Sequence, residues 1–69
     1  MKVYREDDWK AEVEVVKDES DETWERYTLK VLRTVRESRM FNPTPDGTVF
    51  NVDKRKGMNF GGMWTLRDE

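Results

Sequence analysis

The sequence predicts an all-β protein: a small four- to five-stranded antiparallel sheet, strongly bent or closed into a partly open barrel. Three features indicate this fold. Apolar and polar residues alternate with a period of two, the alternating segments are rich in β-branched and aromatic residues, and the breaks between them are polar or contain proline and glycine. The 69 residues are expected to form a single domain, 1–69. SH3-like and OB-like barrels have this size and number of strands.

The composition requires a core made of a few large side chains. Only 35% of the residues are hydrophobic, whereas 41% are charged. An aromatic side chain removes roughly 150–250 Å² from water when it is buried, and such burial favours a folded domain over a disordered chain. The aromatic residues that can supply it are Tyr4, Trp9, Trp24, Tyr27, Phe50, Phe60 and Trp64.

A half-buried strand is predicted over residues 9–17. Apolar side chains occupy one face of this segment, and lysine and glutamate occupy the other. The apolar face consists of Trp9, Ala11, Val13 and Val15. The polar, acidic residues 18–22 that follow are typical of a hairpin loop.

Residues 23–36 fit two interpretations. In a strand, one face would hold Tyr27, Leu29, Val31 and Val35. In a helix, the apolar stripe would be Trp24, Tyr27, Val31, Leu32 and Val35, and the fold would become α+β, with this helix on a three-stranded sheet. The β-branched and aromatic content favours the strand. Charge pairing between strands also favours the strand, because Glu12 and Glu14 would then lie near Thr28 and Lys30.

Residues 37–48 are predicted to be a long connection, because Pro43 and Pro45 prevent a helix or a central strand there. The sequence 45–47, proline-aspartate-glycine, is typical of a turn. Two further short strands are expected over 49–53 and 63–67. Their inward residues would be Phe50, Val52, Trp64 and Leu66.

The chain has no histidine and no cysteine, and this argues against catalysis. The usual general base at neutral pH, the thiolate nucleophile and the commonest zinc ligands are all missing. The densest acidic clusters, 6–8 and 18–22, fall in turn-like segments where carboxylates are normally solvated. Gly57, Gly61 and Gly62 match no phosphate-binding motif. We therefore expect a non-enzymatic protein with no cofactor and no metal site.

Charge is distributed unevenly along the chain, although the net charge is only −2. Residues 1–25 carry ten acidic and four basic side chains, whereas residues 26–56 carry eight basic and three acidic ones. The two halves are expected to pair across the sheet. No segment resembles a membrane span or a signal peptide, and the lack of cysteine is compatible with a reducing compartment. We expect a cytoplasmic protein without membrane contact.

The best candidate for a binding site consists of apolar residues within loops, flanked by a basic stretch. Methionine and phenylalanine beside glycines adapt well to a protein surface, and basic residues steer an acidic partner. The predicted function is an interaction module for a protein partner or for a second copy of the chain. The predicted contact residues are Met40, Phe41, Lys54, Arg55, Lys56, Met58, Phe60 and Met63.

An alternative function is the binding of single-stranded nucleic acid. Lys54, Arg55 and Lys56 lie close in sequence to Phe60 and Trp64, and a basic groove with aromatic platforms can hold a single strand. The sequence pI of about 5.2 argues against it, because dedicated nucleic-acid domains are strongly basic. Protein binding is therefore the preferred hypothesis.

Overall fold

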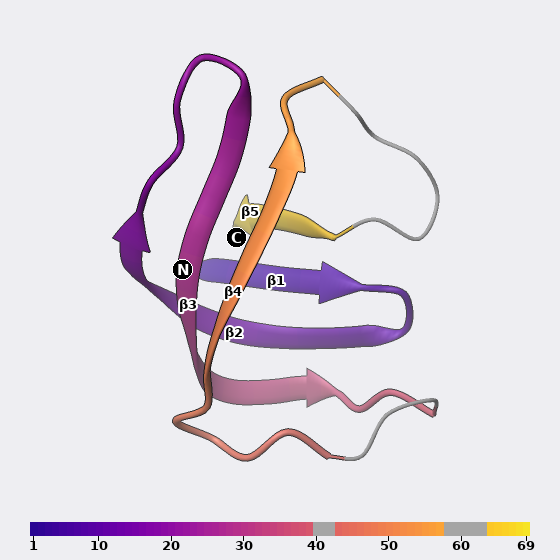
Figure 1. Ribbon diagram of the computed structural model, residues 1–69. Coiled ribbons are helices and arrows are strands. Elements are labelled where there is room, and N and C mark those ends of the chain that lie inside the picture. The colour runs from indigo at the N-terminus through magenta and orange to yellow at the C-terminus, as the bar shows by residue number, and fades with distance from the viewer. Residues whose placement is uncertain (40–42, 58–63) are drawn as a thin grey trace.

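The computed structural model describes residues 1–39, 43–57 and 64–69, and all the regular elements in them are strands. The all-β prediction is confirmed. The strands form one antiparallel sheet in the order β4-β3-β2-β1-β5 (Figure 1). Their bounds are Lys2–Glu6 for β1, Trp9–Asp18 for β2, Trp24–Arg36 for β3, Val49–Arg55 for β4 and Thr65–Asp68 for β5.

The sheet is curled into a half-barrel. In Figure 1, β1, β2 and β5 lie side by side with their axes roughly aligned, and the long strand β3 bends so that β4 crosses in front of them. The two edge strands, β4 and β5, are not paired with each other by a β ladder. The fold is therefore the partly open form of the predicted bent sheet or barrel.

Of residues 23–36, all but the first lie in the strand β3, and the helical alternative is wrong. Val15 lies opposite Leu29, and Glu14 lies opposite Lys30 as the charge pattern predicted. Glu12, however, lies opposite Arg33 and not beside Thr28, and the two side chains form an ion pair of 2.8 Å. Opposite charges from the two halves of the chain thus meet across β2 and β3.

Three bulges interrupt the pairing of β2 with β3. Val16, Leu32 and Val35 are each an extra residue without a partner on the opposite strand. A bulge shifts which residues point to the core, so Thr34 takes the inward position opposite Ala11. The sequence placed Val35 on the apolar face of this strand, but its side chain is 47% exposed.

The strand β1 was missed by the sequence analysis, although it lies inside the sheet between β2 and β5. Tyr4, at its centre, is only 1% exposed. A two-residue turn follows β1, since Glu6 pairs with Trp9, and Asp7 adopts a φ of +52°. Aspartate tolerates this left-handed conformation better than most residues, so the pair of aspartates directly after this segment was the available signal.

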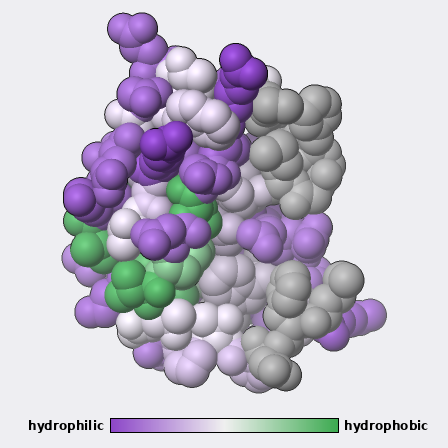
Figure 2. All heavy atoms as spheres, in the orientation of Figure 1, coloured by the Kyte–Doolittle hydropathy of each residue, from purple (hydrophilic) through white to green (hydrophobic). Residues whose placement is uncertain are grey.

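The core lies on the concave face of the half-barrel. Its buried residues are Tyr4, Ala11, Val13, Leu29, Val31 and Trp64. Partly buried residues pack against them, namely Trp9, Val15, Tyr27, Phe50, Val52 and Leu66. The predicted inward positions of β4 and β5 are therefore confirmed. Figure 2 shows that polar and charged side chains cover most of one face, while apolar residues gather in one area at its left.

The predicted turn at 45–47 is also present. Gly47 has a φ of +86°, and the Thr48 N–H donates a hydrogen bond of 3.2 Å to the Pro45 carbonyl. Glycine adopts such a φ without steric cost. In the described part of the chain, no helix is long and apolar enough to traverse a bilayer.

Candidate functional site

Three of the eight predicted contact residues lie in the described part of the chain. These are the basic residues Lys54, Arg55 and Lys56, at the end of β4 and just after it. The apolar ones, Met40, Phe41, Met58, Phe60 and Met63, lie outside the described residues. The structure therefore bears on the basic flank of the predicted surface.

Lys54 has a role inside the domain. Its side chain is only 10% exposed, because it continues the inward alternation of Phe50 and Val52 along β4. Its Nζ donates a hydrogen bond of 3.0 Å to the Trp64 carbonyl and lies 4.5 Å from the centre of the Trp64 ring. The carboxylate of Glu25 is 3.8 Å away. This ammonium is thus held between an aromatic face and a carboxylate.

Trp64 and Lys54 together connect the two edges of the half-barrel. The indole Nε1–H donates a hydrogen bond of 3.1 Å to the main-chain oxygen of Asp53 in β4. Trp64 directly precedes β5, the opposite edge strand. These two side-chain bonds therefore connect β4 to the start of β5, two strands that are not paired with each other in the described sheet.

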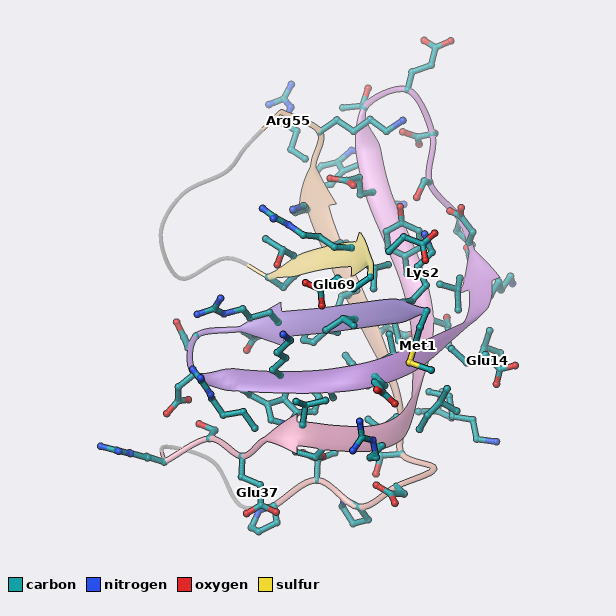
Figure 3. All side chains as sticks on the ribbon, turned by 180° about the vertical axis from the view of Figure 1, so that it is seen from behind. Met1, Lys2, Glu14, Glu37, Arg55 and Glu69 are labelled. Carbon is teal, nitrogen blue, oxygen red and sulfur yellow. The ribbon has the colours of Figure 1, made fainter. Side chains whose placement is uncertain are left out.

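Arg55 and Lys56 are exposed, and Figure 3 shows Arg55 at the far end of β4. An acidic turn lies beside them, since the Lys56 N–H donates to the Thr23 carbonyl. In this turn Asp21 accepts hydrogen bonds of 2.8 Å from the N–H groups of Thr23 and Trp24. These bonds hold the pKa of Asp21 below its usual range, and the positive charge of Lys56 contributes. The basic stretch is thus partly balanced by acidic neighbours.

A cavity that the sequence analysis did not foresee lies on the concave side of the sheet. Its volume is about 320 Å³. Side chains from β1, β2 and β4 line it together with the connection before β4. The described residues around it are Tyr4, Glu6, Trp9, Thr44, Thr48, Phe50, Asn51 and Val52. Part of the loop predicted to touch a partner, 37–48, therefore borders this cavity.

Three aromatic rings form a corner of the cavity. The Tyr4 ring centre is 5.4 Å from that of Trp9 and 5.2 Å from that of Phe50, with interplanar angles of 62° and 77°. The rings of Trp9 and Phe50 are 5.8 Å apart and inclined by 58°. Tyr4 is buried, whereas Trp9 and Phe50 remain partly exposed. The contacts of Tyr4 are edge-to-face packing within the core, so Trp9 and Phe50 supply the accessible aromatic surface of the cavity.

Glu6 is the one charged side chain among the described residues that line this cavity. The Tyr4 hydroxyl donates a hydrogen bond of 2.5 Å to its Oε1. Burial raises the pKa of Tyr4 far above its usual value, and the hydrogen bond to Glu6 and the Glu6 charge add to the effect. Tyr4 thus remains a protonated donor that orients the carboxylate.

A second, smaller cavity of about 210 Å³ lies farther along β3 and β4. It is lined by Glu19, Arg26, Tyr27, Thr28, Asn51, Val52 and Asp53. Its charges are mixed, and the Arg26 guanidinium lies over the Trp24 ring at 5.1 Å. The first cavity is the better-defined candidate, because three rings and one carboxylate converge there.

The cavity escaped prediction because its aromatic residues were assigned to the core. The signal in the sequence was weak: Tyr4 and Glu6 are two residues apart, so they share a face only if β1 is a strand. Among the described residues, no three acidic side chains come close enough together to hold a metal ion. Comparisons of the chain with protein-family models, with curated proteins and with solved structures gave no match.

Proposed function

We propose that this domain is a non-enzymatic interaction module that binds a protein partner at the open side of the half-barrel. The observation that carries the proposal is the aromatic cavity, which borders the loop where the sequence predicts partner contacts. Binding sites commonly combine apolar and aromatic walls with a few well-placed polar groups. Here Trp9 and Phe50 supply the walls, and Thr44 and Thr48 lie at the border.

In this proposal the partner covers the cavity and also contacts the apolar loop residues Met40, Phe41, Met58, Phe60 and Met63. Arg55 and Lys56 supply a positively charged flank that favours an acidic region of the partner. Lys54 contributes to the site indirectly, by holding Trp64. The absence of cysteine agrees with a cytoplasmic location for this activity.

The proposal can be tested by selecting binders from a displayed library of random peptides. A selected peptide is then titrated into ¹⁵N-labelled protein, and the shifted ¹⁵N–¹H signals are mapped. We expect shifts at Thr44, Thr48 and Phe50, and weaker binding by Phe60→Ala with the fold unchanged. Peptides that map to the outer face of β2 and β3, or a library that enriches nothing, would contradict the proposal.

Self-association is a distinct outcome of the same experiments. A second copy of the chain as partner would give concentration-dependent sedimentation and concentration-dependent shifts at the same residues, without any peptide. Nucleic-acid binding remains the alternative, although the placement of Lys54 leaves fewer free basic groups for it. It predicts that a mixed-sequence single-stranded oligonucleotide shifts signals at Arg55 and Lys56 at low salt, and that added salt reverses the shifts.

A further inference from the structure

We propose that the aromatic cavity binds the side-chain ammonium group of a lysine, methylated lysine included, in the protein partner. This inference rests on the proposed function and specifies what the cavity recognises. It depends on three observations: an unpaired carboxylate in the cavity, a corner of aromatic rings, and an equivalent ammonium site elsewhere in the same domain.

The carboxylate of Glu6 lacks a cation. Within residues 1–39, 43–57 and 64–69, no ion pair involves Glu6, and the other described residues that line the cavity are uncharged. Glu6 is also partly buried, so water screens its charge less than at an open surface. The hydrogen bond from Tyr4 is accepted by Oε1, so as far as the described residues go Oε2 is available to a ligand. The cavity therefore favours a positively charged group.

The rings favour a cation of low hydration. The faces of tryptophan, tyrosine and phenylalanine attract cations, and a set of such rings can enclose an ammonium group. The rings of Trp9 and Phe50 are partly exposed and lie 5.8 Å apart at the cavity, whereas the Tyr4 ring is buried in edge-to-face contact with both. With Glu6 beside them, the cavity combines ring faces with a counter-charge.

The domain already contains one ammonium in such surroundings. Lys54 Nζ lies over the ring of Trp64, within 3.8 Å of the Glu25 carboxylate, and is largely withdrawn from water. The cavity offers the same two kinds of partner: aromatic rings in place of Trp64, and the Glu6 carboxylate in place of Glu25. A lysine from another chain would supply the ammonium group that this arrangement lacks.

The cavity is large enough to take a single side chain. Its volume of about 320 Å³ is at the lower end of the roughly 300–1,000 Å³ found for small-molecule pockets. A lysine side chain would place its methylene groups against Phe50 and Val52 and its ammonium beside Glu6. The polypeptide on either side would then contact the loop 43–48.

The test uses peptides selected by display and their synthetic derivatives. We expect the selected peptides to share a lysine whose replacement by Nε-acetyl-lysine weakens binding at least about tenfold, since acetylation removes the charge. Nε-trimethyl-lysine should bind as well as lysine or better. The indole signal of Trp9 and the amide signals of Glu6 and Phe50 should shift in the ¹⁵N–¹H spectrum.

Glu6→Gln is the decisive variant, because glutamine keeps an oxygen that can accept the Tyr4 hydrogen bond. Its matched control is Glu14→Gln, which removes the same charge from an exposed side chain that points away from the sheet (Figure 3). We expect binding of the lysine peptide to weaken about tenfold in Glu6→Gln and to stay within about twofold in Glu14→Gln. Phe50→Leu, which keeps apolar bulk without a ring, should also weaken it.

The remaining outcomes separate this inference from the proposed function. Selected peptides that bind at the cavity equally well after acetylation would overturn the lysine site and leave the interaction module intact. Peptides that bind elsewhere would contradict both. Free tetramethylammonium that binds as tightly as the lysine peptide would assign the cavity to small amines and overturn its assignment to a polypeptide side chain.

Discussion

The indole of Trp64 donates a hydrogen bond of 3.1 Å to the main-chain oxygen of Asp53, and this contact joins the two free edges of the half-barrel. β4 and β5 lie at opposite ends of the strand order, so the polar groups on their outer edges have no ladder partner among the described strands. Trp64 satisfies one of these groups while its ring packs against Tyr4 and Tyr27. The same side chain therefore belongs to the core and to the closure of the barrel.

Trp64→Phe should separate these two roles. Phenylalanine keeps an aromatic ring in the core but removes the Nε1–H donor, so the Asp53 oxygen loses its partner. A lost hydrogen bond of this kind costs about 1–2 kcal/mol of unfolding free energy. Urea denaturation followed by circular dichroism measures the difference, with Trp24→Phe, outside the core cluster, as the control. Equal stability of Trp64→Phe and the wild type would show that the closing bond contributes nothing.

Thr34→Val should leave the domain as stable as the wild type or stabilise it by up to about 1 kcal/mol. The bulges turn Thr34 inward, and its hydroxyl is buried without a hydrogen-bond partner in the described part of the chain. Valine has nearly the same shape and carries no polar atom to bury. The comparison is Thr28→Val, because the Thr28 hydroxyl donates a bond of 2.7 Å to Asn51 Oδ1. Chemical denaturation of both variants checks the prediction, and a clear loss in Thr34→Val would contradict it.

Acid should destabilise the domain through Asp21. Hydrogen bonds from the N–H groups of Trp24 and Thr23 lower the pKa of Asp21 in the folded state from its ordinary value of 3.8. A carboxyl group with a lowered folded pKa contributes stability above its unfolded pKa, and this contribution is lost as the pH falls through the folded pKa. Asp21→Asn keeps the accepting oxygen but does not titrate. Its urea midpoint should therefore fall less than that of the wild type between about pH 4 and pH 2.

The pH experiment needs a second carboxylate for comparison, because several others also have lowered pKa values. Asp18 is one, owing to the backbone N–H of Ser20, and Glu12 is another, owing to Arg33. Asp18→Asn should reduce the acid dependence in the same direction as Asp21→Asn. Identical acid profiles for the wild type and both variants would mean that these turns do not link protonation to folding.

The alternation of apolar residues was sufficient to predict β2 and β4 with their inward faces, whereas the prediction of β3 also needed its β-branched and aromatic content. Val13, Leu29, Phe50 and Val52 are all where period-two patterning placed them. That pattern reports only which residues share a face along an uninterrupted strand. It failed at Val35, because a bulge depends on how two strands fit together and leaves no mark in the alternation of one strand.

The cavity depended on tertiary structure in the same way. Its walls come from β1, β2 and β4 and from the connection before β4, and only the curl of the sheet brings them together. The burial of Lys54 also depended on tertiary structure. Its sequence neighbours indicate an exposed basic stretch. The ring of Trp64, ten residues away, withdraws it from water.

The local pattern of the chain was thus enough for the fold class and for the pairing of Glu14 with Lys30 across β2 and β3. Both follow from interactions between neighbouring residues and strands, which composition and periodicity encode directly. The position of β1 inside the sheet, the bulges and the convergence of Tyr4, Glu6, Trp9 and Phe50 were decided by the closure of the half-barrel. The curl of the sheet depends on the whole chain, because a contact between two distant strands requires the right twist and register in every strand that lies between them.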